Sequence, residues 1–132
     1  MLVDDDPVIN MIHSKLISKS CSYDVDAHEN GKEALHKLAA QLDSDPPELP
    51  SLILLDINMP VIDGWQFLAE LNKLDLDRSA RIKVIIVSSS VDIEDIEKSK
   101  TYPLVTDFIS KPLTMDRMKG IIAQVDDTMN AE

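Results

Sequence analysis

Seven polar residues of this chain could together handle a phosphoryl group. They are aspartates, serines and a lysine, and each group of them follows an apolar segment: Asp4, Asp5, Asp6, Asp56, Ser88, Ser89 and Lys111. An aspartate carboxylate can act as a nucleophile and form an aspartyl phosphate. Crowded carboxylates raise one another's pKa, and Mg²⁺ relieves that repulsion by binding carboxylate, water and phosphate oxygens. A lysine opposite them would pair with a phosphoryl oxygen.

The apolar segments before these residues have the composition of buried β-strands. Residues 52–55 and 84–87 are continuous, short and rich in branched side chains, which is typical of strands covered by helices on both faces. A third apolar run opens the chain at residues 1–3, and a fourth lies around residues 107–109. Residues 22–27 alternate in polarity, which predicts a strand nearer the edge of the sheet.

Helical patterns lie between the predicted strands. Asp6 followed by Pro7 is typical of a helix start, and Asn30, Asp63 and Thr114 are the capping residues of three further patterns. Residues 91–100 form a weaker pattern. The side chains that these helices should bury recur at helical spacing: Val8, Ile9, Ile12, Leu16, Ile17, Ala34, Leu35, Leu38, Leu42, Phe67, Leu68, Leu71, Ile93, Ile96, Met118, Ile121, Ile122, Val125 and Met129.

The order is therefore a strand followed by a helix, five times. This alternation predicts an α/β fold in which a five-stranded parallel sheet has helices on both faces. Ligands of such open sheets bind beyond the carboxyl ends of the strands. We therefore expect the aspartates, the serines and Lys111 to meet at one edge of the sheet.

Four motifs resemble those of the response-regulator receiver domain of two-component phosphorelay systems, the CheY-like family. They are residues 3–7 (VDDDP), 55–64 (LDINMPVIDG), 87–89 (VSS) and 108–112 (FISKP). Each motif is weak or moderate alone, but all four in order at the ends of the predicted strands are specific. The resemblance covers essentially the whole chain. It implies a flavodoxin-like (βα)5 fold with strand order 2-1-3-4-5.

The resemblance implies an acceptor and a metal site. Asp56 would be the phospho-acceptor. Asp5, Asp56 and the backbone carbonyl of Asn58 would bind Mg²⁺ or Mn²⁺, and Asp4 would act mainly through water. Asp6 is expected to serve only as the helix cap.

The resemblance also implies a set of phosphate-sensing and structural residues. Ser88 takes the position of the switch hydroxyl, with Ser89 one step beyond it. Lys111 would pair with the phosphate, and Phe108 occupies the aromatic switch position. Pro60, Gly64 and Pro112 would have structural roles. The peptide bond before Pro112 would be cis.

The function that the resemblance implies is that of a signalling domain. A sensor histidine kinase or a histidine phosphotransfer protein would donate a phosphoryl group, and a conformational change would then alter protein binding. The fourth helix, fifth strand and last helix would form the face for a downstream protein target. Residues 1–132 would be one receiver domain with no output domain, and would catalyse only their own phosphorylation and slow dephosphorylation. A phosphorelay intermediate and a phosphate sink remain alternatives.

Composition excludes several other classes of protein. The 13 basic and 24 acidic residues give a net charge of −11, which disfavours direct binding to nucleic acid or anionic lipid. The sequence has no 18-residue apolar run and no signal peptide, so we expect a soluble, cytoplasmic protein. Its one cysteine, Cys21, cannot form a disulfide within the chain and is expected to be buried. The first predicted strand is short, as if a few residues usually precede Met1.

Rival functions lack the residues that they need. A phosphohydrolase of the haloacid dehalogenase type, the remote alternative, would have a second aspartate two positions after Asp56, where this chain has Asn58. A flavodoxin-like electron carrier would need a loop rich in hydroxyl groups and glycine where three aspartates stand.

The histidines, His13, His28 and His36, show no metal-binding spacing and are expected to be exposed. Trp65 is expected to be a partly buried helix residue.

Overall fold

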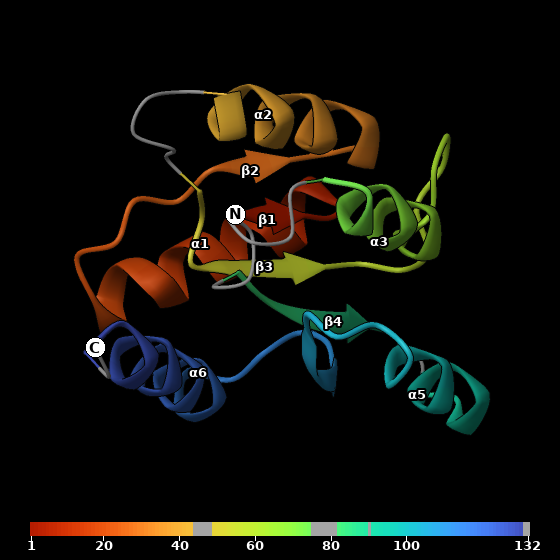
Figure 1. Cartoon of the computed structure of the whole chain (residues 1–132). Coiled ribbons are helices and arrows are strands. Elements are labelled where there is room, and N and C mark those ends of the chain that lie inside the picture. The colour runs from red at the N-terminus through yellow and green to blue at the C-terminus, as the bar shows by residue number, and fades with distance from the viewer. Residues whose placement is uncertain (44–48, 75–81, 90, 131–132) are drawn as a thin grey trace.

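A computed structural model of the chain describes residues 1–43, 49–74, 82–89 and 91–130. Strands and helices alternate along the described residues: β1 (Leu2–Val3), α1 (Pro7–Ser20), β2 (Ala27–His28), α2 (Gly31–Asp43), β3 (Leu52–Leu55), α3 (Gly64–Asn72), β4 (Lys83–Ser88), α5 (Ile93–Ser99), β5 (Val105–Ser110) and α6 (Met115–Asn130). All strand pairs are parallel, and the order across the sheet is β2-β1-β3-β4-β5 (Figure 1). The predicted fold class and strand order are confirmed.

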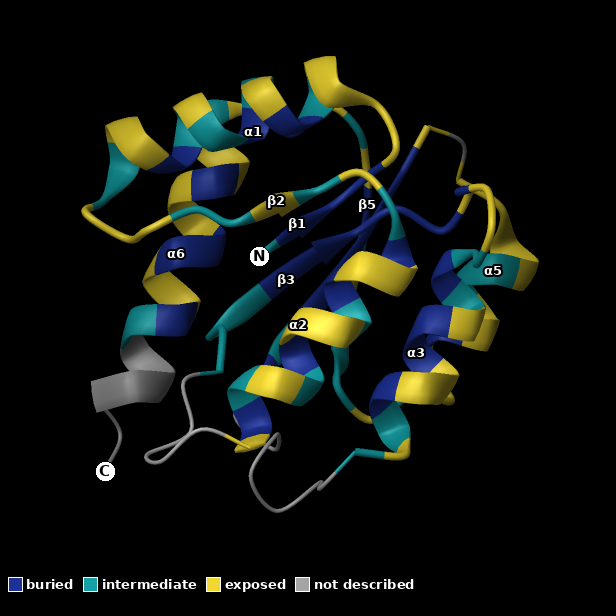
Figure 2. Ribbon diagram, turned by 90° about the horizontal axis from the view of Figure 1, so that it is seen from above, coloured by how far each residue is buried: buried dark blue, intermediate teal, exposed yellow. Residues whose placement is uncertain are grey.

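Alternating strand residues face two separate hydrophobic clusters. Val3, Ile53 and Leu55 belong to the cluster that packs against α2 and α3, whereas Leu2 and Leu54 belong to the cluster that packs against α1 and α6. This division follows from the strand geometry, in which successive side chains point to opposite faces. Because both faces are covered by helices, the inner strands β1 and β3 are apolar and largely buried, as Figure 2 shows, whereas the edge strands β2 and β5 include exposed residues.

The predicted helix caps are confirmed by hydrogen bonds. The Asp6 carboxylate accepts from the Val8 N–H at 2.9 Å, and Asp63 and Gln66 form a reciprocal capping box at the start of α3. Asn30 accepts from the Glu33 N–H, and Thr114 accepts from the Arg117 N–H. These caps fix where α1, α2, α3 and α6 begin, and the segments between β1 and α1, between β3 and α3 and between β5 and α6 carry most of the polar residues.

The prediction of a strand over residues 22–27 is wrong for most of that range. Only Ala27 and the following His28 form β2, because they pair with Leu2 and Val3, the two residues of β1. Parallel pairing needs a partner on the neighbouring strand, and the pairing with β1 begins where the Asp26 carbonyl accepts from the Leu2 N–H. Alternating polarity alone could not show that β1 pairs with β2 over only two residues.

The predicted apolar stripes are partly wrong in α1 and α5. The side chains of Val8 and Ile93 are 54% and 77% exposed, although both were expected to face the core. Each residue lies at the first turn of its helix, where it points away from the sheet toward solvent. The buried residues of α1 are Asn10, His13 and Ile17.

Three further expectations concern single side chains. His13 is 2% exposed, so its predicted exposure is wrong. Cys21 is only half-buried, and Trp65 is partly buried as expected, where its ring stacks on Tyr102. The Met118 side chain is buried as expected, whereas the side chain of Met129 lies outside the described part of the structure. Among the described helices, none has both the length and the apolar composition that a membrane span requires.

Candidate functional site

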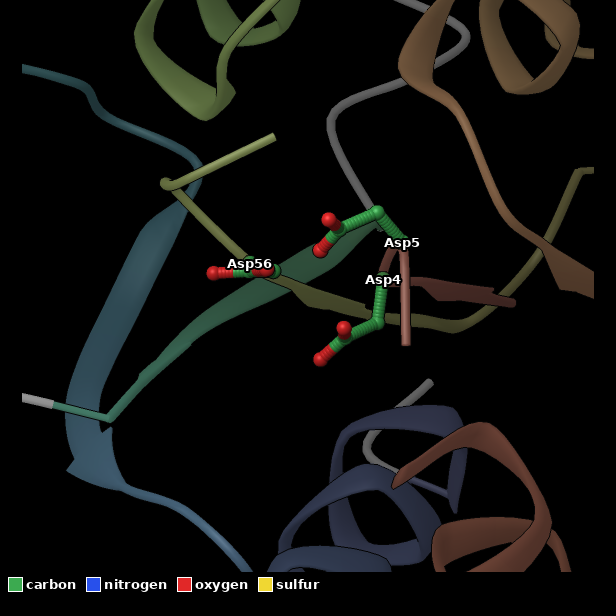
Figure 3. Close-up of side chains that lie close together, drawn as sticks. All are labelled: Asp4, Asp5 and Asp56. Carbon is green, nitrogen blue, oxygen red and sulfur yellow. The ribbon is translucent and has the colours of Figure 1, made fainter. Parts of the chain in front are cut away.

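The carboxylates of Asp4, Asp5 and Asp56 lie together beyond the carboxyl ends of β1 and β3. These two strands are neighbours in the sheet, and Asp56 follows Leu55, which pairs with Val3. One oxygen from each carboxylate lies within 4.8 Å of the other two (Figure 3). The fold therefore brings together the three acidic residues that the sequence predicted to form one site.

Asp56 is one of the two buried members of this cluster, with Asp4. Its side chain is 1% exposed, and its Oδ1 accepts a hydrogen bond of 3.0 Å from the Asn58 N–H. Its Oδ2 has no hydrogen-bond partner in the described structure, although it lies 3.4 Å from Lys111 Nζ. Burial raises the pKa of Asp56 to about 6, and the nearby charge of Asp4 adds to that effect. The residue thus presents a buried carboxylate oxygen that accepts no hydrogen bond among the described residues and has Lys111 as its nearby cation.

Lys111 supplies the positive charge of the site. Its Nζ lies 3.1 Å from Asp4 Oδ2, and its side chain is 12% exposed. Burial lowers the pKa of Lys111, but the hydrogen bond to Asp4 and the charge of Asp56 outweigh burial and raise the pKa overall. The lysine is therefore charged at neutral pH. The following Lys111–Pro112 peptide bond is cis, as the sequence resemblance implied.

Asp4 and Asp5 differ in their surroundings. Asp4 is buried, and its two oxygens accept from the Asp6 N–H at 2.9 Å and from Lys111. Asp5 is exposed to solvent. A hard divalent cation prefers carboxylate oxygens and keeps several waters. An exposed Asp5 close to the Asp56 carboxylate fits such a cation, whereas both oxygens of Asp4 are already engaged by the Asp6 N–H and Lys111.

The other predicted site residues lie at the same edge of the sheet but differ in burial. Ser88 ends β4 and is fully buried, whereas Ser89 is exposed. The Ser88 carbonyl accepts from the Lys111 N–H at 2.9 Å, which ties the end of β4 to the lysine. Phe108 lies on β5, is half-buried and packs against the cluster on the α2 and α3 side. Asn58, whose N–H donates to Asp56, is exposed.

The loop after Asp56 depends on two unusual backbone positions. A Cβ atom on Gly64 would lie 2.6 Å from Ile57 Cα and 2.8 Å from the Asp56 carbonyl oxygen, so only glycine fits there. Val61, directly after Pro60, has a φ of 71° and is 77% exposed. A β-branched residue in this left-handed region is strained. The close packing of Gly64 and the turn at Val61 together set the path of the chain away from Asp56.

Asn10 and His13, to which the sequence patterns gave no role in the site, lie next to it. The Asn10 side chain donates to the Asp4 carbonyl at 3.0 Å, and His13 Nε2 accepts from the Leu113 N–H at 3.2 Å. Both side chains are buried on the inner face of α1. Their spacing to Ile17 gave a signal, because positions 10, 13 and 17 share one face of a helix. Because both side chains are polar, they do not belong to an apolar stripe, which is the pattern that predicts the buried face of a helix.

A family model for the response regulator receiver domain matches residues 1–123 of the chain. Among curated proteins, the chain is 32% identical over 120 residues to the "Probable C4-dicarboxylate response regulator DctR" of Bacillus subtilis, covering 90% of this chain and 48% of that protein. It is 28% identical over 122 residues to "Sporulation initiation phosphotransferase F" of the same organism, covering 92% and 88%. The chain spans about half the length of the two C4-dicarboxylate regulators that it matches.

Solved structures give the same result for the fold. A two-component response regulator from Cytophaga hutchinsonii superimposes with a TM-score of 0.86 at 28% identity, covering 96% of this chain and 94% of that chain. A CheY-like receiver domain protein from Methanospirillum hungatei superimposes with a TM-score of 0.77 at 23% identity, covering 99% and 95%.

Proposed function

The chain belongs to the response regulator receiver domain family, and on that basis we propose that Asp56 accepts a phosphoryl group from a phosphohistidine of a partner protein. The observation that carries this proposal is the state of Asp56 Oδ2. It is buried, it has no hydrogen-bond partner among the described residues, and it lies 3.4 Å from the charged Lys111. A carboxylate oxygen left this way is available as a nucleophile.

In the proposed reaction, an Asp56 carboxylate oxygen attacks phosphorus while the bond from phosphorus to the imidazole nitrogen breaks. The histidine leaves as neutral imidazole after protonation, and an aspartyl phosphate remains. Lys111 offsets the negative charge on the phosphoryl oxygens, and the Asn58 N–H holds the acceptor carboxylate in place. A divalent cation such as Mg²⁺ or Mn²⁺, held by Asp5, Asp56 and the Asn58 carbonyl, with Asp4 acting through water, would neutralise further charge on the transferring group.

The proposed output is a change in protein binding through α5, β5 and α6. The new phosphoryl group attracts the Ser88 hydroxyl and Lys111, and movement of Ser88 makes room for the half-buried Phe108 to turn inward. The equilibrium between two packings of this face then shifts, because the phosphoryl group makes different contacts in each. A sensor histidine kinase or histidine phosphotransfer protein would be the donor, and a protein that binds this face would be the target.

Acetyl phosphate with Mg²⁺ tests the proposal without a cognate kinase. Intact-mass measurement should show a gain of one phosphoryl group in the wild type and none in Asp56→Asn. EDTA should prevent the gain. Asp24→Asn changes an exposed carboxylate before β2 and serves as the control that should still gain the group. No gain in the wild type, or an equal gain in Asp56→Asn, would refute the proposal.

A further inference from the structure

Helix α1 presents two buried polar side chains to the site, one helical turn apart. Asn10 and His13 are 5% and 2% exposed, and buried polar groups persist when they are hydrogen-bonded. Asn10 donates to the Asp4 carbonyl at 3.0 Å and to the His28 carbonyl at 3.4 Å. His13 accepts from the Leu113 N–H. The two bonds connect α1 to the two chain segments that carry Asp4 and Lys111.

The segment that carries Lys111 is anchored on both sides of that residue. On one side the Lys111 N–H donates to the Ser88 carbonyl at 2.9 Å, which extends the pairing of β4 with β5. On the other side the Leu113 N–H donates to His13 Nε2 at 3.2 Å. Leu113 is itself buried in the cluster between the sheet and α6. Of these two hydrogen bonds, the first joins two backbone groups, and the second depends on a side chain, that of His13.

We propose that His13 is a positioning residue for phosphoryl transfer, acting on Lys111 through the backbone of Leu113. Its bond holds residues 111–113 against α1, so that Lys111 Nζ reaches both Asp4 and Asp56, at 3.1 and 3.4 Å. The inference rests on the proposed function of Asp56. His13 does not touch the reacting atoms, so its effect on the reaction must pass through the position of the lysine.

The bond requires an unprotonated Nε2 on His13, and the surroundings provide for that. Burial lowers the pKa of His13, and the charge of Lys111 lowers it further, whereas the charge of Asp4 acts in the opposite direction. Without an acceptor at position 13, the Leu113 N–H would be buried and unsatisfied. The segment would relieve this by shifting, which would move Lys111 with it.

The decisive comparison is between two substitutions at the same position. His13→Leu removes the acceptor, and His13→Gln keeps one on a side chain oxygen. We expect His13→Leu to slow the mass gain from acetyl phosphate with Mg²⁺ about tenfold, since small misplacements of a catalytic group have effects of that order or larger. His13→Gln should restore the rate to within about twofold of the wild type, because an amide oxygen can accept the same N–H.

A control separates positioning from general loss of stability. Ile17→Ala removes a buried side chain from the same face of α1, one turn further from the site. It should lower the melting temperature but leave the phosphorylation rate unchanged at temperatures where the protein is folded. If His13→Leu does not fold, as checked by circular dichroism, His13→Phe provides a planar ring without an acceptor. Equal rates in the wild type and in the folded acceptor-free variant would overturn the inference.

A double-mutant cycle tests the route through Lys111. If His13 acts only by placing the lysine, His13→Leu should cause no further loss of rate in the Lys111→Ala background. An additional tenfold loss there would overturn the inference. Failure of the proposed function has a different signature, because the wild type itself would then gain no phosphoryl group.

Discussion

Lys111 Nζ lies closer to a carboxylate oxygen of Asp4 than to one of Asp56, at 3.1 against 3.4 Å. The lysine is therefore already paired before any phosphoryl group arrives. A new dianion on Asp56 must compete with Asp4 for this one cation, which gives the phosphorylated state a different set of contacts from the resting state.

Lys111→Ala should lower the free energy of unfolding at pH 7, without added metal, by about 3 kcal/mol. The substitution leaves Asp4 and Asp56 buried without their cation, and breaking a buried ion pair has an effect of that order. Urea unfolding measures the change. Lys100→Ala is the matched control, because its pair with Glu97 has the same 3.1 Å distance but is about 65% exposed on both sides, so its loss should be below about 1 kcal/mol. Equal losses in the two variants would contradict a stabilising buried ion pair at Lys111. Normal phosphorylation-dependent partner binding by Lys111→Ala would contradict the role of Lys111 in sensing the phosphoryl group.

Asp56 should make the metal-free protein less stable as the pH rises from about 4 to about 7. Its pKa is raised from 3.8 to about 6 in the folded state, so in this window the folded protein binds more protons than the unfolded chain. Stability is therefore lost as the carboxyl ionises. Asp56→Asn removes this loss, and the variant's advantage over the wild type should grow by roughly 2–3 kcal/mol between pH 4 and pH 7.

Unfolding in EDTA across this pH range measures the advantage of Asp56→Asn. Addition of Mg²⁺ is the control, since a bound cation compensates the Asp56 charge and should reduce the dependence on pH in the wild type. A difference between the two proteins that stays constant with pH would show that the Asp56 carboxyl has its ordinary pKa.

Gly64→Ala should lower the free energy of unfolding by about 2 kcal/mol, because the added Cβ would meet backbone atoms that cannot easily shift. Those atoms belong to Ile57 and Asp56, so the phosphorylation rate should fall as well. Thermal unfolding and the acetyl phosphate assay measure the two effects. Gly120→Ala in α6 is the matched control. Nothing lies within 4 Å of its Cβ position, so it should stabilise the helix by up to about 1 kcal/mol.

Val61→Gly should raise the free energy of unfolding by about 0.5 kcal/mol. Relief of the left-handed conformation contributes about 1–2 kcal/mol, and the greater freedom of glycine in the unfolded chain offsets part of it. The control is Val91→Gly, which changes an exposed valine without a positive φ and should destabilise the protein. If both substitutions destabilise the protein equally, the strain at Val61 is not a real feature of the loop.

The sequence predicted the elements and the acidic site because these depend on local signals. The helix starts were predicted from four capping residues: Asp6, Asn30, Asp63 and Thr114. The apolar runs before Asp56 and Ser88 predicted strands buried on both faces. Parallel strands place their carboxyl ends on one edge, so the meeting of Asp4, Asp5 and Asp56 followed from topology alone.

What the sequence could not predict depends on partners that are distant along the chain. Residues 22–26 alternate like a strand, but the register of β1 with β2 begins at Ala27, and Asp26 contributes only its carbonyl to the Leu2 N–H. His13 was expected to be exposed, because nothing near it in the sequence indicates a partner, and the Leu113 N–H that it accepts from is 100 positions away. Its burial is a tertiary effect, visible only when α1 and the segment after β5 are placed side by side.

The ion pair between Asp4 and Lys111 joins residues that are 107 positions apart in a chain of 132. Contacts of such long range pay a loop-closure entropy that is recovered only when the intervening structure has assembled. Asp4 follows β1 and Lys111 follows β5, so the two side chains meet only when β1, β3, β4 and β5 have paired across the sheet. A nascent or partly folded chain can present Asp56 but not the charge balance around it. Competence to accept phosphate would then report that folding is complete, so that molecules still being synthesised or refolded stay silent in signalling.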